Sequence, residues 1–176
     1  MSAGRRHWLF KSEPHEFSFD DLWAAPDRTT MWDGVRNYQA RNLMRDEMRV
    51  GDLALFYHSG VEPPAVVGVV EVVRAAYPDP TAFDATDPHF DPKSRRDAPT
   101  WVAVDVRARE QFVRPVTLPE LRATPGLEGM ELLRRGSRLS VQPVRAEEWA
   151  IVHALGTASA GRGSAGAAGG RSVRRP

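Results

Sequence analysis

The stretch that decides the fold is residues 32–42, Trp32-Asp33-Gly34-Val35-Arg36-Asn37-Tyr38-Gln39-Ala40-Arg41-Asn42. It contains an Asp-Gly turn dipeptide followed by Asn37, a good N-cap, so a helix is expected to begin near Tyr38. Apolar residues then recur at helical spacing. A helix N-terminus offers free backbone N–H groups and a partial positive charge, here with Arg36 before it and Trp32 across the turn. Two interpretations stay open: a binding corner for a flat anionic ligand, or a core tryptophan followed by a capped surface helix.

The composition describes one cysteine-free body with a basic tail. A chain of 176 residues is long enough for one domain. The absence of cysteine excludes disulfides, thiolate catalysis and cysteine-ligated zinc. The formal charge of +1 is misleading, because four of the 24 basic residues follow residue 156 and leave 20 against 23 acidic residues in the body. Any nucleic-acid binding by such a body must therefore use local basic patches.

Neither a membrane span nor a signal peptide is evident, because no apolar run is long enough and the first seven residues have no apolar segment behind their arginines. We therefore expect a cytoplasmic protein without membrane contact. A monomer is the default expectation.

Strands and helices are expected to alternate along the body. Residues 53–58 and 65–73 are predicted strands that are apolar on both faces, which favours a closed or strongly curled small sheet, with a bulge or bend at Gly68. Further strands are predicted at 7–11, 101–107 and 139–144, the last as an edge strand. Helices are predicted after capping boxes at Ser18 and Thr117 and over 147–155.

Two segments do not fit this alternation. Residues 77–99 are rich in proline and aspartate and are expected to form an ordered excursion or a lid. Residues 157–176 consist mostly of Gly, Ala, Ser and Arg, cannot form a core and are expected to be disordered.

Catalytic and metal-binding motifs are weak in this sequence. The aspartates between Asp79 and Asp91 could be a divalent-metal loop, but Asp-Pro pairs are common turn starters and the spacing fits neither an EF-hand nor a two-metal site. His58-Ser59 lacks the Gly-x-Ser-x-Gly elbow of serine hydrolases. Glycine-rich phosphate loops are absent as well. We therefore expect no catalytic residue, metal or cofactor.

A set of aromatic and hydrogen-bonding side chains at strand ends and turns remains. Base recognition needs such a set, because a flipped base is held by stacking and by hydrogen bonds to its edge, while arginines hold the flanking phosphates. Taken singly, each residue is better explained as a core side chain or as a turn cap. The set comprises Lys11, Ser12, Trp32, Asn37, residues 56–59, Trp101 and residues 135–140.

Five blocks of the sequence together resemble the EVE domain family, including the thymocyte nuclear protein group. The blocks are residues 7–14, 32–42, 56–59, 77–81 and 138–144. The resemblance covers residues 6–155 and excludes the tail 157–176. It implies an α+β fold of the PUA-like type, a small mixed β-barrel with flanking helices that is distantly related to YTH and ASCH domains.

The same resemblance implies a non-catalytic reader that holds a flipped, modified base of DNA or RNA, such as methylated or hydroxymethylated cytosine, in an aromatic pocket. The implied pocket residues are Lys11, Ser12, Trp32, Val35, Asn37, Tyr57, His58, Ser59 and, by looser analogy with the YTH cage, Trp101. Arg36, Arg41 and Arg138 would lie near phosphates. Two alternatives remain: a hydrolase or nuclease acting on modified nucleic acid, or a small-molecule-binding barrel.

Overall fold

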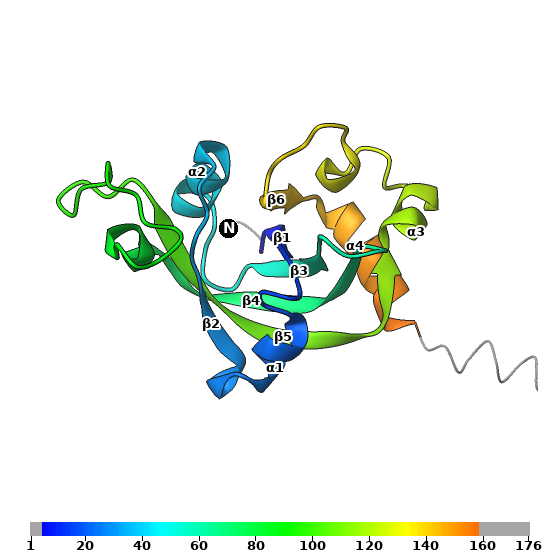
Figure 1. Ribbon diagram of the computed structural model, residues 1–176. Helices are drawn as coiled ribbons and strands as arrows, with labels where there is room; N and C mark the ends of the chain where they lie inside the picture. Colours follow the sequence, from blue (N-terminus) through cyan, green and yellow to red (C-terminus); the bar gives the residue numbers. More distant parts are fainter. Residues whose placement is uncertain (1–4, 159–176) are drawn as a thin grey trace, which may run out of the picture.

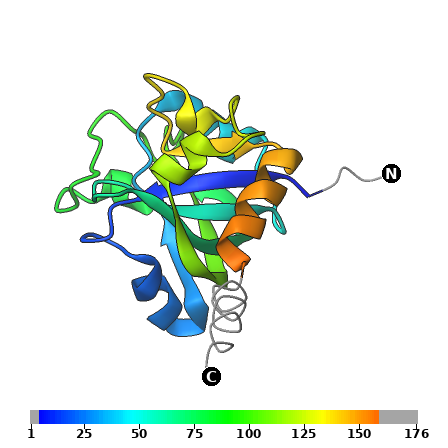
Figure 2. The same ribbon diagram turned by 90° about the vertical axis from the view of Figure 1, so that its right-hand side faces the viewer.

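The computed structural model describes residues 5–158 and shows one mixed sheet with helices on both sides (Figures 1 and 2). The strands are β1 (His7–Ser12), β2 (Thr29–Trp32), β3 (Leu53–His58), β4 (Ala65–Pro78), β5 (Val102–Thr117) and β6 (Val141–Val144). The helices are α1 (Phe19–Ala24), α2 (Tyr38–Asp46), α3 (Leu118–Ala123) and α4 (Ala146–Thr157). Short 3-10 turns occur at Pro26–Arg28, Pro80–Phe83 and Glu131–Leu133. Within residues 5–158, no helix is long and apolar enough to cross a membrane.

The predicted helix starts are confirmed. Asn37 caps α2, since its side-chain oxygen accepts a hydrogen bond from the Ala40 N–H at 2.9 Å. Ser18 begins α1 with a full capping box, and Thr117 caps α3. The expected disordered tail begins too early, because α4 includes Thr157, whose hydroxyl donates to the His153 carbonyl at 2.7 Å. The rest of that tail, residues 159–176, lies outside the described residues.

The expected closed barrel is corrected to an open sheet. The strand order is β2-β5-β4-β3-β1-β6, so β2 and β6 are its two edges among the described residues. β1 pairs with β3 in parallel, and the other pairs are antiparallel. β4 and β5 are long and pair with several register shifts, which bend the sheet strongly (Figure 1). β2, which contains Trp32, is a strand that the sequence did not predict.

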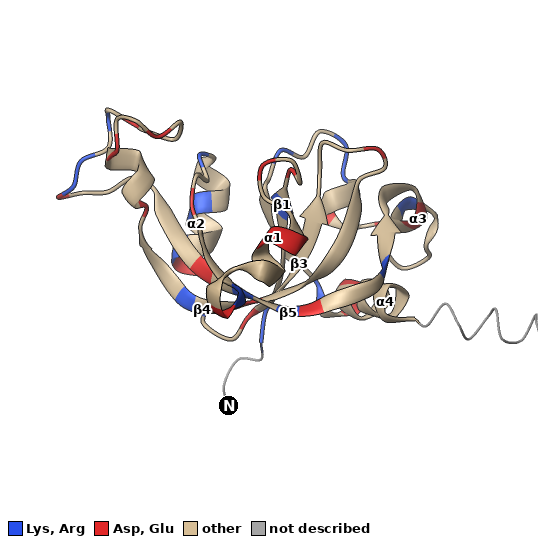
Figure 3. Ribbon diagram, turned by 60° about the horizontal axis from the view of Figure 1, so that its bottom comes forward, with Lys and Arg blue, Asp and Glu red and all other residues tan. Residues whose placement is uncertain are grey.

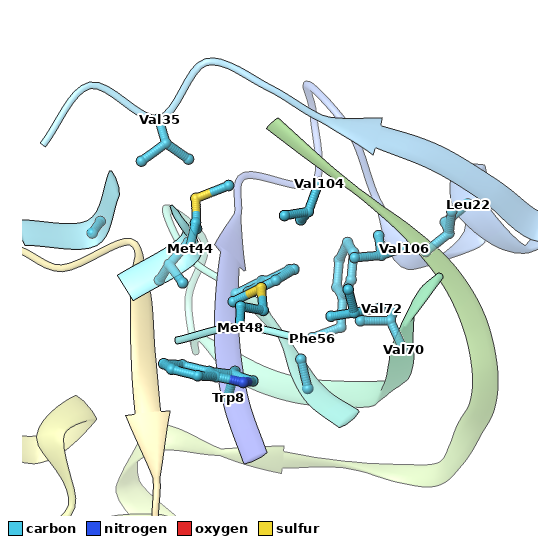
Figure 4. Packing of buried hydrophobic residues seen from close by; sticks show 14 of the residues in the cluster. Trp8, Leu22, Val35, Met44, Met48, Phe56, Val70, Val72, Val104 and Val106 are labelled. Carbon is cyan, nitrogen blue, oxygen red and sulfur yellow. The ribbon is translucent and has the colours of Figure 1, made fainter. Parts of the chain in front are cut away.

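Both faces of the curled sheet are buried, which explains why its central strands are apolar on both sides. One core contains Trp8, Phe56 and Met44 and is covered by α1 and α2. Figure 4 shows these side chains pointing into a common interior with the valines of β4 and β5. The second core, with Leu55 and Val152 among its members, lies between the other face and α3 and α4. Alternate residues of one strand therefore serve different cores.

The predicted bend at Gly68 is confirmed as a break in strand register. Gly68 pairs with Phe56, but Tyr57 pairs with Val66, so the register shifts at Val67. A Cβ atom at this position would lie 2.5 Å from the Phe19 ring and 2.8 Å from the Glu110 carbonyl. The absence of a side chain therefore lets α1 pack closely against the sheet.

We predict that Gly68→Ala destabilises the fold by about 1–3 kcal/mol, because the new methyl group overpacks a space already filled by a ring and a backbone carbonyl. Gly129→Ala is the matched control: its Cβ would come no nearer than 3.8 Å to another side chain, so its effect should stay within about 0.5 kcal/mol. Urea unfolding of both variants measures the difference. Equal stabilities would show that Phe19 moves away at no cost.

Candidate functional site

A cavity of about 440 Å³ opens beside the ends of β1 and β2. A volume of this size is typical of small-ligand sites. Its walls come from the end of β1, the loop before α1, the end of β2 and the turn after it, with single residues from two distant loops. The lining residues are Lys11, Ser12, Glu13, Glu16, Phe17, Thr30, Met31, Trp32, Asp33, Gly34, Val35, His89 and Ser140. We call this cavity the Trp32 pocket.

The Trp32 pocket lies in the seam between the two ends of the sheet. β2 is the last strand at one end of the order, whereas β1 and β6 lie at the other end. The sheet curls until Trp32 on β2 meets Phe10 on β1, with ring centroids 5.1 Å apart. The two ends thus touch through side chains, while within residues 5–158 no hydrogen-bonded ladder joins them.

Trp32 packs in the core, as one interpretation of the sequence expects, and it is also a wall of the pocket. Its ring packs edge-on against Phe56 at 5.6 Å and against Phe17 at 6.4 Å between centroids. The side chain is nevertheless only partly buried and lines the cavity. A ring held this firmly is a preformed stacking surface for a flat ligand.

The buried carboxylate of Asp79 fixes the turn that follows Trp32. It accepts hydrogen bonds from the Gly34 N–H at 2.8 Å, from Arg36 Nη1 at 3.0 Å and from the Thr81 N–H at 2.8 Å. Burial acts to raise the pKa of Asp79, but these hydrogen bonds outweigh it and hold the pKa below its usual value. Asp79 therefore joins the turn after β2 to the excursion between β4 and β5, residues 79–101.

Arg36 belongs to this network, and its expected role at a phosphate stays a prediction. Besides the Asp79 ion pair, its Nη2 donates to the His89 carbonyl at 2.7 Å. Its guanidinium is thus engaged within the protein. Gly34 is equally constrained, because its φ is +78° and a Cβ atom there would lie 2.7 Å from the His89 ring.

The charged groups in the pocket are mostly acidic. Lys11 is the only amine among the lining residues, whereas Glu13, Glu16 and Asp33 are carboxyl groups. Burial lowers the pKa of Lys11, and burial together with nearby Asp79 raises the pKa of Asp33. Such a lining repels a phosphate and suits a neutral ring that carries hydrogen-bond donors.

Ser12 lines the pocket, and its hydroxyl proton already takes part in a hydrogen bond within the protein. Its hydroxyl donates to the Phe17 carbonyl at 2.6 Å, which ties the end of β1 to the loop before α1. The oxygen lone pairs remain for a ligand. Of the nine expected pocket residues, the structure thus places four, Lys11, Ser12, Trp32 and Val35, around one cavity.

The other five expected residues do not line the Trp32 pocket. Tyr57 is buried in the second core, since it follows Phe56 and strand residues alternate between faces. Asn37 is occupied as the cap of α2. The Trp101 indole N–H donates to Asp91 at 2.7 Å and its ring packs against Tyr38. Ser59 donates its backbone N–H to the Ser12 carbonyl, so it supports the end of β1 from outside.

His58 is likewise occupied, which weakens the hydrolase alternative. Its Nε2 accepts a hydrogen bond from the Phe19 N–H at 3.1 Å, and burial lowers its pKa. An imidazole held as an acceptor at the start of α1 is not free to take a proton from water or from a substrate.

The excursion carboxylates are also used within the protein. Asp84, Asp87 and Asp91 each accept a backbone N–H two residues ahead, as turn-forming aspartates do. An exposed group of Glu13, His15 and Glu16 brings its ligand atoms within 4.8 Å of one another, a common arrangement for solvated acids. Neither set requires a metal.

The two other arginines expected near phosphates, Arg41 and Arg138, differ in whether their side chains are engaged within the protein. Arg41 donates to the Thr100 carbonyl at 2.7 Å and so holds the end of the excursion against α2. Arg138 is exposed, two residues before the pocket residue Ser140. Arg138 thus remains a candidate phosphate contact, close in sequence to the pocket.

Eight lining residues were not predicted from the sequence. Asp33 and Gly34 lie within residues 32–42, directly after Trp32, so their position was a signal for them. His89 reaches the pocket only through the tertiary fold, whereas Ser140 belongs to the candidate segment 135–140. The eight residues are Glu13, Glu16, Phe17, Thr30, Met31, Asp33, Gly34 and His89.

Comparison with known proteins agrees with this architecture. The EVE domain model matches residues 6–155. Human Thymocyte nuclear protein 1 is 45% identical over 166 residues, which cover 85% of this chain and 73% of that protein. A hypothetical protein from Leishmania major has a TM-score of 0.81 with 48% identity, covering 87% of this chain and 95% of that one.

A solved complex is also similar: human THYN1 protein with DNA that contains 5-methylcytosine. It has a TM-score of 0.81 and 43% identity, and the match covers 88% of this chain and 99% of that one. The expected resemblance is therefore confirmed. Since the family model spans nearly all of the described residues and close relatives share more than two fifths of their sequence, the chain belongs to the EVE domain family.

Proposed function

We propose that this protein is a non-catalytic reader of modified cytosine in DNA and that the Trp32 pocket receives the base. The observation that carries the proposal is the THYN1 complex with DNA containing 5-methylcytosine, which shares the fold at a TM-score of 0.81 and 43% identity. The pocket described above supports it, because it combines a fixed aromatic wall with polar groups at its rim.

The apolar part of the pocket suits a methylated pyrimidine. Phe17 and Trp32 offer ring surfaces, and Met31 and Val35 add aliphatic surface within the same cavity. A base stacks favourably on an aromatic side chain. One extra methyl group in an apolar hollow contributes about 1–3 kcal/mol, which corresponds to tens to hundreds of fold in affinity.

The charges favour insertion of a base, with phosphates remaining outside. Three carboxyl groups line the pocket, so a phosphate would be repelled there. Across residues 5–158, Figure 3 shows basic and acidic residues interspersed along the ribbon, with residues of both kinds on the loops. The sugar-phosphate backbone would thus follow exposed arginines such as Arg138. A base must leave the stack to enter, so single strands should bind more tightly than intact duplex.

Trp32 should determine the preference for the modified base. Wild type should bind a short single strand with one 5-methylcytosine at least about tenfold more tightly than the same strand with cytosine. Trp32→Ala should abolish that difference by removing the stacking wall. Trp23→Ala is the matched control, because Trp23 is a half-buried tryptophan on α1 that does not line the Trp32 pocket.

Fluorescence polarisation measures these affinities, and thermal unfolding verifies that each variant is folded. Because Trp32 also packs in the core, Trp32→Phe is included to retain part of that packing. Equal binding of the two strands by folded wild type would contradict the proposed function. A loss of preference in Trp23→Ala as well would contradict the assignment of the pocket.

Two arginine variants should separate a phosphate contact from a structural arginine. Arg138→Ala should reduce the slope of log affinity against log salt concentration by about 0.7 on single strands without altering stability. Arg36→Ala should instead lower the free energy of unfolding by about 1.5–3 kcal/mol, since a buried charged hydrogen bond to Asp79 is lost. Arg122→Ala, exposed on α3 over the other face of the sheet, is the control. An unchanged salt slope in Arg138→Ala would remove this arginine from the DNA path.

A further inference from the structure

We infer that the Asp33 carboxyl reads the N3–N4 edge of the bound cytosine and takes up one proton on binding. This inference rests on the proposed function and names the residue that recognises the base edge. It makes cytosine binding dependent on pH in a way that stacking on Trp32 alone does not.

Asp33 is placed to read a base because it directly follows Trp32 and lines the same cavity. Asp33 is half-buried, so a ligand in the pocket would displace much of the water that still contacts its carboxyl group. The neighbouring acids Asp79, Asp87 and Asp91 each accept hydrogen bonds from other residues. Within residues 5–158, the carboxylate of Asp33 accepts no hydrogen bond from another residue, and its own backbone N–H is the one donor that stabilises it.

The turn around Asp33 is held rigidly, so the carboxyl cannot swing far from the pocket. The Gly34 N–H donates to Asp79 at 2.8 Å. The same glycine lies under the His89 ring in a left-handed conformation, with φ of +78°. A reading group that is fixed before the ligand arrives loses little conformational entropy on binding.

The charges facing Asp33 favour its protonated form. Burial is the largest effect and raises its pKa, and Asp79 and Asp87 add to the rise. Its own backbone N–H and His89 act in the opposite direction. The other charged residues that line the pocket with Asp33 are Lys11, Glu13 and Glu16, from β1 and the loop that follows it. Desolvation by a bound base would raise the pKa further.

Cytosine presents an amine donor at N4 beside an acceptor at N3. An ionised carboxylate can accept from N4, but its second oxygen then faces the N3 lone pair. One proton from solvent removes this conflict, since a carboxylic acid donates from its hydroxyl to N3 and accepts from N4 with its carbonyl oxygen. The same two bonds result if the proton resides on N3, so the pair gains one proton in either description.

The sign of the pH dependence follows from this linkage. Asp33 must have a higher pKa in the complex than in the free protein, so affinity is greatest below the free pKa and falls as pH rises. Between the two pKa values, affinity should fall by up to tenfold per pH unit, because one proton is taken up per complex. Above the pKa in the complex, affinity becomes constant again.

The test measures affinity for a single strand with one 5-methylcytosine from about pH 5.5 to pH 8.5. Wild type should bind more tightly at low pH. Asp33→Asn should bind with a flat profile, because a carboxamide offers the donor and the acceptor without a proton. Asp33→Ala should bind at least tenfold more weakly at low pH and also without a slope. Asp46→Asn, on an exposed residue of α2, should retain the wild-type profile.

A change in the DNA base tests the uptake of the same proton. A strand in which a C–H group replaces N3 of 5-methylcytosine cannot accept the Asp33 proton. Wild type should bind this strand with a flat profile. Thermal unfolding over the same pH range verifies that every protein is folded.

Each outcome has a distinct meaning. If wild type prefers 5-methylcytosine with no pH dependence, or if Asp33→Asn retains the slope, the inference is wrong and the proposed function stands. If His89→Gln removes the slope while Asp33→Asn keeps it, His89 carries the proton. If folded wild type binds no strand at any pH, the proposed function fails and the inference with it.

Discussion

The structure of the pocket depends on the buried carboxylate of Asp79. This group connects two segments far apart in the sequence, because it accepts from Gly34 after β2 and from Thr81 in the excursion. Arg36 completes the network and then holds the His89 carbonyl. A buried carboxylate without these donors would cost several kcal/mol. The turn that carries Asp33 and the loop that carries His89 are therefore positioned by one charge.

The open sheet explains where the pocket lies and why a barrel was a reasonable expectation. Strands that are apolar on both faces do predict a curled sheet, and the sheet curls until Trp32 contacts Phe10 across its two ends. A hydrogen-bonded closure would have filled this seam with backbone. Because side chains alone close it, a cavity can open there, with the ends of β1 and β2 as its walls.

Sequence patterns predicted local structure well and the composition of the site only in part. The starts of α1, α2 and α3 depend on residues three positions apart, so local rules find them. Strand alternation could have excluded Tyr57, because its neighbour Phe56 faces the other core. The role of Arg36 could not be found locally, since its partner lies 43 positions away. His89 enters the pocket for the same tertiary reason.

Under the proposed function, the net acidic charge of the body would favour discrimination between bases. Removing the four arginines after residue 156 leaves 20 basic against 23 acidic residues, so the attraction to phosphates that every strand shares is small. A contribution of about 1–3 kcal/mol from one methyl group is then a large part of the total binding free energy. In a strongly basic protein the same pocket would be masked by tight binding to unmodified DNA. An acid-lined pocket on an acidic body therefore suits a reader that must release strands lacking its base.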